Sequence, residues 1–383
     1  MSMTYPEALI NPAALVWVRT QGGYTPEEMA TKASVSPERY EQWEHGEERP
    51  SLRQLFELAG KCHWPLSMFY MNKMPPGEPA LPDFRRLPET AKGELSSHAR
   101  LELRLARERR AAVLELLPQT EGPPDMKRWE FVGSATRNTP IPELAAKARQ
   151  ILGVTLATQS GWTTEYQALN GWKQAFEDAG IFVFQCSLDI EEFRAAAMVE
   201  KPYPVVLVNT KDAPLGRVFS LLHELGHIFL GQSNISSVWD GGGNDEVYCN
   251  RFAAETLMPG TVLAQDRRIT SLKGQEASFD DVHGVARRYW VSAHAAALRM
   301  KDFGIRTDTV LRKLIAQATA ARNTPRESEG GPTYYVTQAS HLGTLLIRST
   351  LRGMDENVIT IMEASKILGV KAKNLEKLRE HAY

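Results

Sequence analysis

The sequence is poor in cysteine, has no long apolar run and carries almost no net charge. Its three cysteines, Cys62, Cys186 and Cys249, are odd in number and lie far apart along 383 residues. They argue against a disulfide framework and favour a reducing compartment. No apolar stretch approaches the ~20 residues that a membrane-spanning helix needs. With 45 basic and 46 acidic residues, the chain has no overall charge that would attract polyanions.

A secretion signal is also missing from the first residues. Asn11 and Pro12 interrupt the first apolar stretch, and no basic segment precedes it. The sequence therefore predicts a cytoplasmic protein without a membrane partner. Hydrophobic residues make up 43% of the chain and charged residues 24%, which is typical of soluble proteins with real cores. At this length, two or three domains are expected.

What the sequence does contain is a polar trio inside an apolar helix. Residues 217–230, RVFSLLHELGHIFL, repeat apolar side chains at helical spacing and predict a buried helix. Since His223 and His227 are one helical turn apart, their imidazoles can converge on a single point. Glu224 lies beside that point, and the HExxH pattern predicts two zinc ligands and a proton-transferring carboxylate. Gly226 costs the helix about 1 kcal/mol relative to alanine, which predicts a close neighbour there.

A zinc site that acts on a substrate needs a third protein ligand and an open position. A glycine-rich loop at 239–244 is followed by a predicted helix with Glu246 at its start and Asn250 one turn later on the same face. Glu246 is the predicted ligand, and the Asn250 oxygen would accept the second N–H of a ligand histidine. The alternative role for Glu246 is a first-turn acid favoured by the helix dipole. Competing third ligands are Glu255, Asp245 and Asp240.

HELGH followed by E-x-x-C-N-R-F-A-A-E-T-L-M-P resembles the ImmA/IrrE family of bacterial zinc metallopeptidases, most closely over residues 216–259. The resemblance implies a gluzincin-type site with Zn²⁺ held by His223, His227 and Glu246, and with Glu224 as catalytic residue. Thermolysin-like enzymes have Asp where this chain has Asn250, so its histidine would be held less strongly. An oxyanion donor is also needed, and four side chains are candidates for it: His283, Tyr289, His294 and Tyr248.

The first part of the chain resembles an XRE-type helix-turn-helix domain. Helix-start signals occur at Thr25-Pro26 and again at Ser36-Pro37, with the turn KASV between them. The predicted recognition helix, SPERYEQWEHG, offers three residues to DNA: Arg39, Tyr40 and Gln42. Residues 11–72 hold six Lys or Arg and eight Glu, however, and this acidic balance weakens phosphate binding. DNA binding and docking to a protein both remain open for this domain.

These features predict an α+β fold that is mostly α. An all-helical helix-turn-helix domain is followed by a zincin-like, gluzincin-type peptidase domain with a small sheet and by a helical C-terminal region. Residues 96–117 form an amphipathic helix, interpreted as a solvated interdomain helix, with a helix that contacts nucleic acid or a partner as the alternative. Strands are expected at 182–184 and 205–208, and a helix pair at 280–300. The predicted ranges are 8–75 for the helix-turn-helix domain, 76–138 for linker and amphipathic helix, 139–320 for the peptidase domain, and 333–383 for the C-terminal region, itself helix-turn-helix-like.

The resemblance implies a zinc endopeptidase of narrow specificity. Its substrate would be a transcriptional repressor, often of the XRE type, cut to switch on a stress or mobile-element operon. The alternative is a DNA-binding regulator or antitoxin-like partner protein whose metal site is structural or weakly active. Homodimerisation is left open by the sequence.

Overall fold

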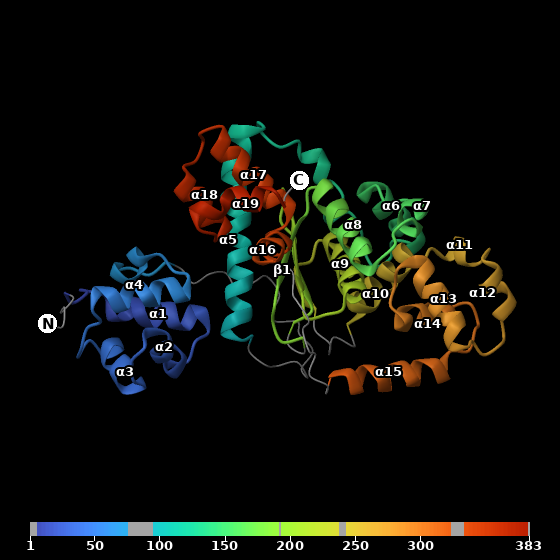
Figure 1. Cartoon of the computed structure of the whole chain (residues 1–383), viewed down its shortest axis with the longest axis horizontal. Helices are drawn as coiled ribbons and strands as arrows, with labels where there is room; N and C mark the ends of the chain where they lie inside the picture. The colour runs from blue at the N-terminus through green and yellow to red at the C-terminus, as the bar shows by residue number, and fades with distance from the viewer. Residues whose placement is uncertain (1–5, 76–94, 191–192, 237–242, 323–332, 382–383) are drawn as a thin grey trace. The chain divides into compact units, whose positions relative to one another are not determined.

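The computed structural model describes residues 6–75, 95–190, 193–236, 243–322 and 333–381. They form mostly helices and one small sheet, as the sequence predicted (Figure 1). The chain divides into two compact units, residues 1–86 with 92–105 and residues 87–91 with 106–383. No helix among the described residues combines the length and apolarity that crossing a bilayer requires.

The first unit is all-helical, and the helices that begin at Pro26 and Pro37 confirm the two predicted helix starts. Proline occupies the first turn of three helices, and Asn11, Thr25 and Ser36 each accept a backbone N–H at the start of their helix. Ser34 adopts a left-handed conformation and ends the second helix, so the turn is 34–36 and not the predicted KASV. The elements are α1 (Pro12–Gly22), α2 (Pro26–Ala33), α3 (Pro37–His45), α4 (Leu52–Cys62) and the 3₁₀ helix η1 (Leu66–Tyr70).

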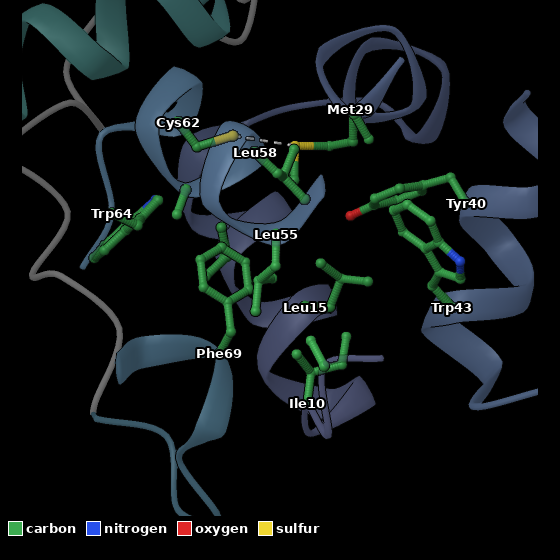
Figure 2. Packing of buried hydrophobic residues seen from close by; sticks show 14 of the residues in the cluster. Ile10, Leu15, Met29, Tyr40, Trp43, Leu55, Leu58, Cys62, Trp64 and Phe69 are labelled. Carbon is green, nitrogen blue, oxygen red and sulfur yellow. Dashed lines mark hydrogen bonds between the residues drawn. The ribbon is translucent and has the colours of Figure 1, made fainter. Parts of the chain in front are cut away.

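One face of α3 packs into the hydrophobic core of this unit. Figure 2 shows Tyr40 and Trp43 facing Leu15 and Leu55. Both aromatic side chains are fully buried. The prediction that Tyr40 contacts DNA is therefore wrong, because its ring serves the core. Arg39 is exposed and pairs with Glu48 at 2.9 Å.

Helix α5 (Ser97–Thr120) is longer than the predicted 96–117, and its arginines are not simply solvated. In the first unit, Arg104 donates to the carbonyl of Cys62 at 2.6 Å and lies 3.9 Å from the Trp64 ring centroid. In the second unit, Arg110 donates to the carbonyls of Pro202 and Tyr203, at 2.8 Å each. Both side chains are buried. The interpretation as a solvated helix is corrected accordingly, because two of its guanidinium groups are buried and donate to backbone carbonyls.

The sheet of the second unit has four strands in the order β1-β3-β2-β4. β1 and β3 are parallel, with Phe182 opposite Val205, while β2 pairs antiparallel with both β3 and β4. The first three strands are fully buried. The predicted strands at 182–184 and 205–208 are confirmed, but β2 and β4 were missed. Their bounds are β1 (Phe182–Cys186), β2 (Ala195–Met198), β3 (Val205–Asn209) and β4 (Asn234–Ser236).

The predicted peptidase boundary at residue 139 is too late. Trp129 donates its indole N–H to the carbonyl of Gly180 at 2.9 Å. The backbone N–H groups of Gly133 and Ala135 bind the carbonyls of Ile228 and Phe229, at 3.0 and 2.9 Å. Residues 129–135 therefore cover the end of the helix that carries the two histidines, and they belong to the domain rather than to a linker.

The other helices of the second unit surround this sheet and extend beyond it. α8 and α9 pack together, and α9 also packs against β2, β3 and α10. The C-terminal helices belong to the same unit, with α16 against β1. The predicted helix pair at 280–300 is confirmed as α13 and α14. The elements are η4 (Met126–Trp129), α6 (Ile141–Leu152), α7 (Leu156–Ser160), α8 (Glu165–Asp178), α9 (Pro214–Leu230), α10 (Asn244–Leu257), α11 (Gly260–Leu263), α12 (Arg267–Leu272), α13 (Phe279–Tyr289), α14 (Ala293–Lys301), α15 (Asp308–Arg322), α16 (Tyr334–Leu342), α17 (Thr344–Asp355), α18 (Ile361–Leu368), η5 (Ala372–Asn374) and α19 (Leu375–Arg379).

Candidate metal centre

The two histidines lie on α9, which is buried along most of its length. Pro214 opens the helix, and Gly231 ends it in a left-handed conformation. Exposure is 5% for His223, 0% for Glu224 and 2% for His227, so three ionisable groups sit inside an apolar helix, as predicted. Burying such groups is costly unless each finds a compensating partner.

Helix α10 crosses α9 closely, and Gly226 makes this approach feasible. A Cβ atom on Gly226 would lie 2.9 Å from the Cys249 sulfur and 3.2 Å from the ring of Phe252. The predicted close neighbour of Gly226 is thus α10. Because the helices touch at this point, a side chain one turn before Cys249 can reach the histidines.

That side chain is Glu246, and it completes a compact cluster. Its two carboxylate oxygens lie 3.0 Å from His223 Nε2 and 3.2 Å from His227 Nε2. The two Nε2 atoms are 3.1 Å apart. One ligand atom from each residue lies within 4.8 Å of the others. Two imidazole nitrogens and a carboxylate converging on one point are a donor set that suits Zn²⁺.

Asn250 orients the first histidine. Its side-chain oxygen lies 3.0 Å from His223 Nδ1. An amide oxygen only accepts hydrogen bonds, so Nδ1 is the protonated nitrogen and Nε2 presents its lone pair to the cluster. A hydrogen bond of this kind would keep His223 in the tautomer that can bind a metal.

The electrostatics of the cluster favour positive charge at its centre. Burial acts to lower the pKa of His223, but Glu246, Glu224 and Asn250 outweigh it and the pKa is raised. For Glu246, burial acts to raise the pKa, but hydrogen bonds with His223 and His227 dominate and hold the pKa far below its usual range. The carboxylate therefore stays ionised and attracts a cation.

The competing ligands have other partners. Glu255 forms an ion pair with Arg299 and accepts the backbone N–H of Gly260 at 2.8 Å. Asp245 pairs with Arg137 at 3.1 Å. Asp240 lies outside the described residues. Cys249 is fully buried, and burial raises the pKa of its thiol, which disfavours the thiolate that a metal needs.

Two of the candidate oxyanion donors are engaged elsewhere. Tyr248 donates its hydroxyl to the carbonyl of Thr139 at 2.9 Å. The His283 ring packs on Phe279, with centroids 4.8 Å apart. Tyr289 is buried in α13 and His294 is exposed on α14. The described contacts of Tyr248 and His283 give no support for a role at the cluster.

Sequence reasoning missed Asn209, which shapes the approach to α9. Its fully buried side chain donates to the carbonyls of Leu188 and Phe193, at 3.0 and 2.7 Å, and accepts the N–H of Lys211 at 3.0 Å. It thereby ties the end of β3 to the loop before β2 and to the turn that leads into α9. A usable signal was present: VVLVN places a polar amide directly after an apolar strand.

Replacing Asn250 with alanine is expected to weaken zinc binding about 10–100-fold without unfolding the protein, because His223 loses the acceptor that fixes its tautomer. Chelator competition with purified protein measures this affinity. Asn244→Ala, on the same helix and on the rim of a groove of about 810 Å³, is the matched control and should bind zinc like the wild type. Equal affinities of Asn250→Ala and wild type would remove Asn250 from the site.

Comparison with known proteins gives two family matches. Residues 176–301 match the family described as IrrE N-terminal-like domain, and residues 15–63 match the family described as helix-turn-helix. The first range contains β1–β4, α9 and α10, and the second contains α2 and α3. No curated protein matches the chain. The two resemblances drawn from the residues are thereby confirmed.

Proposed function

From the premise that a helix-turn-helix domain and an IrrE-type peptidase domain share one chain, we propose a zinc-dependent endopeptidase of narrow specificity. The observation that carries the proposal is the convergence of His223, His227 and Glu246 within 4.8 Å. The family match supports a peptidase. Zinc is proposed in addition, because the three converging side chains suit it.

The residues present fit a zinc ion. His223 and His227 would bind it through Nε2, and Glu246 through a carboxylate oxygen. When bound, zinc supplies Lewis acidity, which activates water and polarises a carbonyl. The Asn250 hydrogen bond keeps His223 in the required tautomer.

Glu224 is proposed as the catalytic residue. It directly follows His223 on α9 and is fully buried, and its charge acts on the His223 ring. A carboxylate so placed can take the proton of the attacking water and deliver it to the leaving amine. Its burial excludes bulk water that would compete for the proton.

An extended substrate would add to the sheet beside β4. Among the described strands, β1 and β4 are the two ends of the order β1-β3-β2-β4. Helix α16 packs against β1, while β4 directly follows α9, the helix with both histidines, in sequence. Pairing along a free strand edge holds a peptide by its backbone and leaves side-chain pockets to select it.

The proposed substrate is a transcriptional repressor of the XRE type in the cytoplasm. Support comes from the helix-turn-helix domain on the same chain, which could bring the enzyme to a repressor or to its operator. Cleavage would then release a stress or mobile-element operon. Arg39 and Gln42 are the remaining DNA-contact proposals, both on α3.

A regulatory role without efficient catalysis is the second candidate, favoured by the same helix-turn-helix match. DNA affinity should be modest, because neighbouring glutamates neutralise the arginines. Arg19 pairs with Glu44 at 2.7 Å and Arg39 with Glu48 at 2.9 Å. Few cations are then left to meet phosphates.

The experiment that separates the two candidates uses the repressor encoded next to this protein's gene. Incubating both purified proteins with zinc is expected to give one specific cut in the repressor, and a chelator should abolish it. Mass spectrometry of the fragments locates the cut. An intact repressor, together with zinc bound by the wild-type protein, would favour the regulator.

A further inference from the structure

The C-terminal helices are joined to the sheet by a buried polar contact. At the end of α16, both the carbonyl and the hydroxyl of Ser340 accept from the Gln185 amide of β1, at 2.6 and 2.5 Å. Lys173 of α8 donates to the same two oxygens, at 3.2 and 3.3 Å. Gln185 is 2% exposed and Lys173 8% exposed. Burial lowers the pKa of Lys173 to about 8, and the nearby Glu177 carboxylate acts against this shift.

The side chain of Gln185 also links this contact to α9, the helix that carries the two histidines. The Gln185 side-chain oxygen accepts from Arg217 Nη1 at 2.7 Å. Arg217 is 7% exposed and lies on α9, six residues before His223. The Gln185 amide thus donates to α16 through its nitrogen and accepts from α9 through its oxygen. A continuous chain runs from Ser340 through Gln185 and Arg217 to the helix that carries the histidines.

A second buried contact holds α16 and α17 in place. Glu177 of α8 is 5% exposed and accepts both the backbone N–H of Thr344, at 3.1 Å, and its hydroxyl. The carboxylate therefore caps the first turn of α17. Gly343, between the two helices, has a φ of +75°. A Cβ atom there would lie 2.3 Å from Glu177 Oε1 and 2.7 Å from the backbone oxygen of Val183, so the contact requires glycine.

We propose that Arg217 is a positioning residue for the metal centre and that docking of α16 onto β1, through Ser340 and Gln185, holds it in place. Loss of the α16 contact would then loosen the first half of α9 and weaken metal binding. Of its two measurements, only the zinc affinity rests on the proposed function. Amide exchange in the metal-free protein does not.

The physical basis is the orientation of one buried amide. While α16 is docked, Ser340 fixes the Gln185 nitrogen, and the oxygen must point to Arg217. Without α16 the amide is free to turn or to meet water, and a buried guanidinium loses an acceptor that it needs. Apolar packing of Val218 and Leu221 still holds α9, since both are fully buried. The expected result is therefore loosening of the helix rather than its unfolding.

The test replaces Gly343 with alanine in the full chain. Gly369→Ala is the matched control, because Gly369 also has a positive φ, of +63°, lies in the same C-terminal region and has nothing within 4 Å of its would-be Cβ. Gly343→Ala should accelerate amide exchange in residues 217–222 of the metal-free protein and weaken zinc binding about tenfold. Gly369→Ala should change neither. Unchanged exchange and affinity in Gly343→Ala would overturn the proposal.

A double-mutant cycle distinguishes the Arg217 link from general loosening. In an Arg217→Met background the buried charge is gone, so Gly343→Ala should no longer change exchange in residues 217–222. An equal effect of Gly343→Ala in both backgrounds would show that Arg217 does not couple α16 to α9, and would overturn the proposal. If Gly343→Ala fails to fold, Thr344→Val, which removes one hydrogen bond to Glu177, replaces it in the cycle with the same expected pattern.

The two proposals fail in different ways. A wild-type protein that binds no zinc refutes the proposed function, while amide exchange in the metal-free protein still tests the link through Arg217. A protein that binds zinc with an affinity insensitive to both α16 and Arg217 refutes only the link.

Discussion

The Glu224→Gln variant is expected to bind zinc and to fold like the wild type but to cleave about 10²–10⁴-fold more slowly, the usual contribution of a general base. Glutamine has the size of glutamate, so the fully buried position stays filled without a cavity. What the amide loses is the ability to take a proton from water. Single-turnover cleavage of the repressor measures the chemical step, and zinc content measured on the same sample checks the metal.

Glu165→Gln, an exposed change at the start of α8, is the control and should keep full activity. Two results would contradict the assignment. Full activity in Glu224→Gln would remove Glu224 from the mechanism. Loss of zinc together with activity would show that Glu224 helps to hold the metal instead of moving protons.

The second large effect is expected from His227→Ala. Structural zinc sites bind with about 10–16 kcal/mol, so one of four ligands accounts for about 3 kcal/mol, or about 100-fold in affinity. The variant should also lose the stabilisation that zinc confers on the folded protein, about 4 kcal/mol at 1,000 times the dissociation constant. Chelator competition measures the affinity, and thermal unfolding with and without zinc measures the stabilisation.

His45→Ala is the matched control, since His45 is exposed at the end of α3. It should bind zinc and respond to it like the wild type. If His227→Ala keeps both the zinc affinity and the zinc-dependent rise in unfolding temperature, the histidines do not share a metal. The contacts of Glu246 with His223 and His227, at 3.0 and 3.2 Å, would then have a structural role only.

The convergence of the candidate metal ligands was largely predictable because its geometry is local. His223 and His227 lie on one helix at fixed spacing, and Glu246 and Asn250 repeat the same spacing on the next. Helix periodicity alone brings each pair to one face. The sequence favoured Glu246 and kept Glu255 as a competing ligand, because excluding Glu255 depends on Arg299, which comes from α14 and pairs with Glu255.

The errors lie where tertiary contacts outweigh local patterns. Strand β2, Ala-Ala-Ala-Met, has little intrinsic strand preference and forms because it pairs with β3 and β4. Tyr40 was placed on the DNA-facing side, but α3 turns it into the core. Residues 129–135 contain no regular pattern, and their place in the second unit is shown by tertiary hydrogen bonds to Gly180 and to the end of α9.

By itself, the sequence determined which helices carry the candidate metal ligands, where the helices of the first unit start, and the two most apolar strands. Those features follow from side-chain spacing and end-capping within a few residues. Only the tertiary structure decided which acid meets the histidines, which arginines are buried, and how Ser340 reaches Arg217 through Gln185. These contacts join residues distant in sequence, and their free energy depends on burial and on partners that no local pattern specifies.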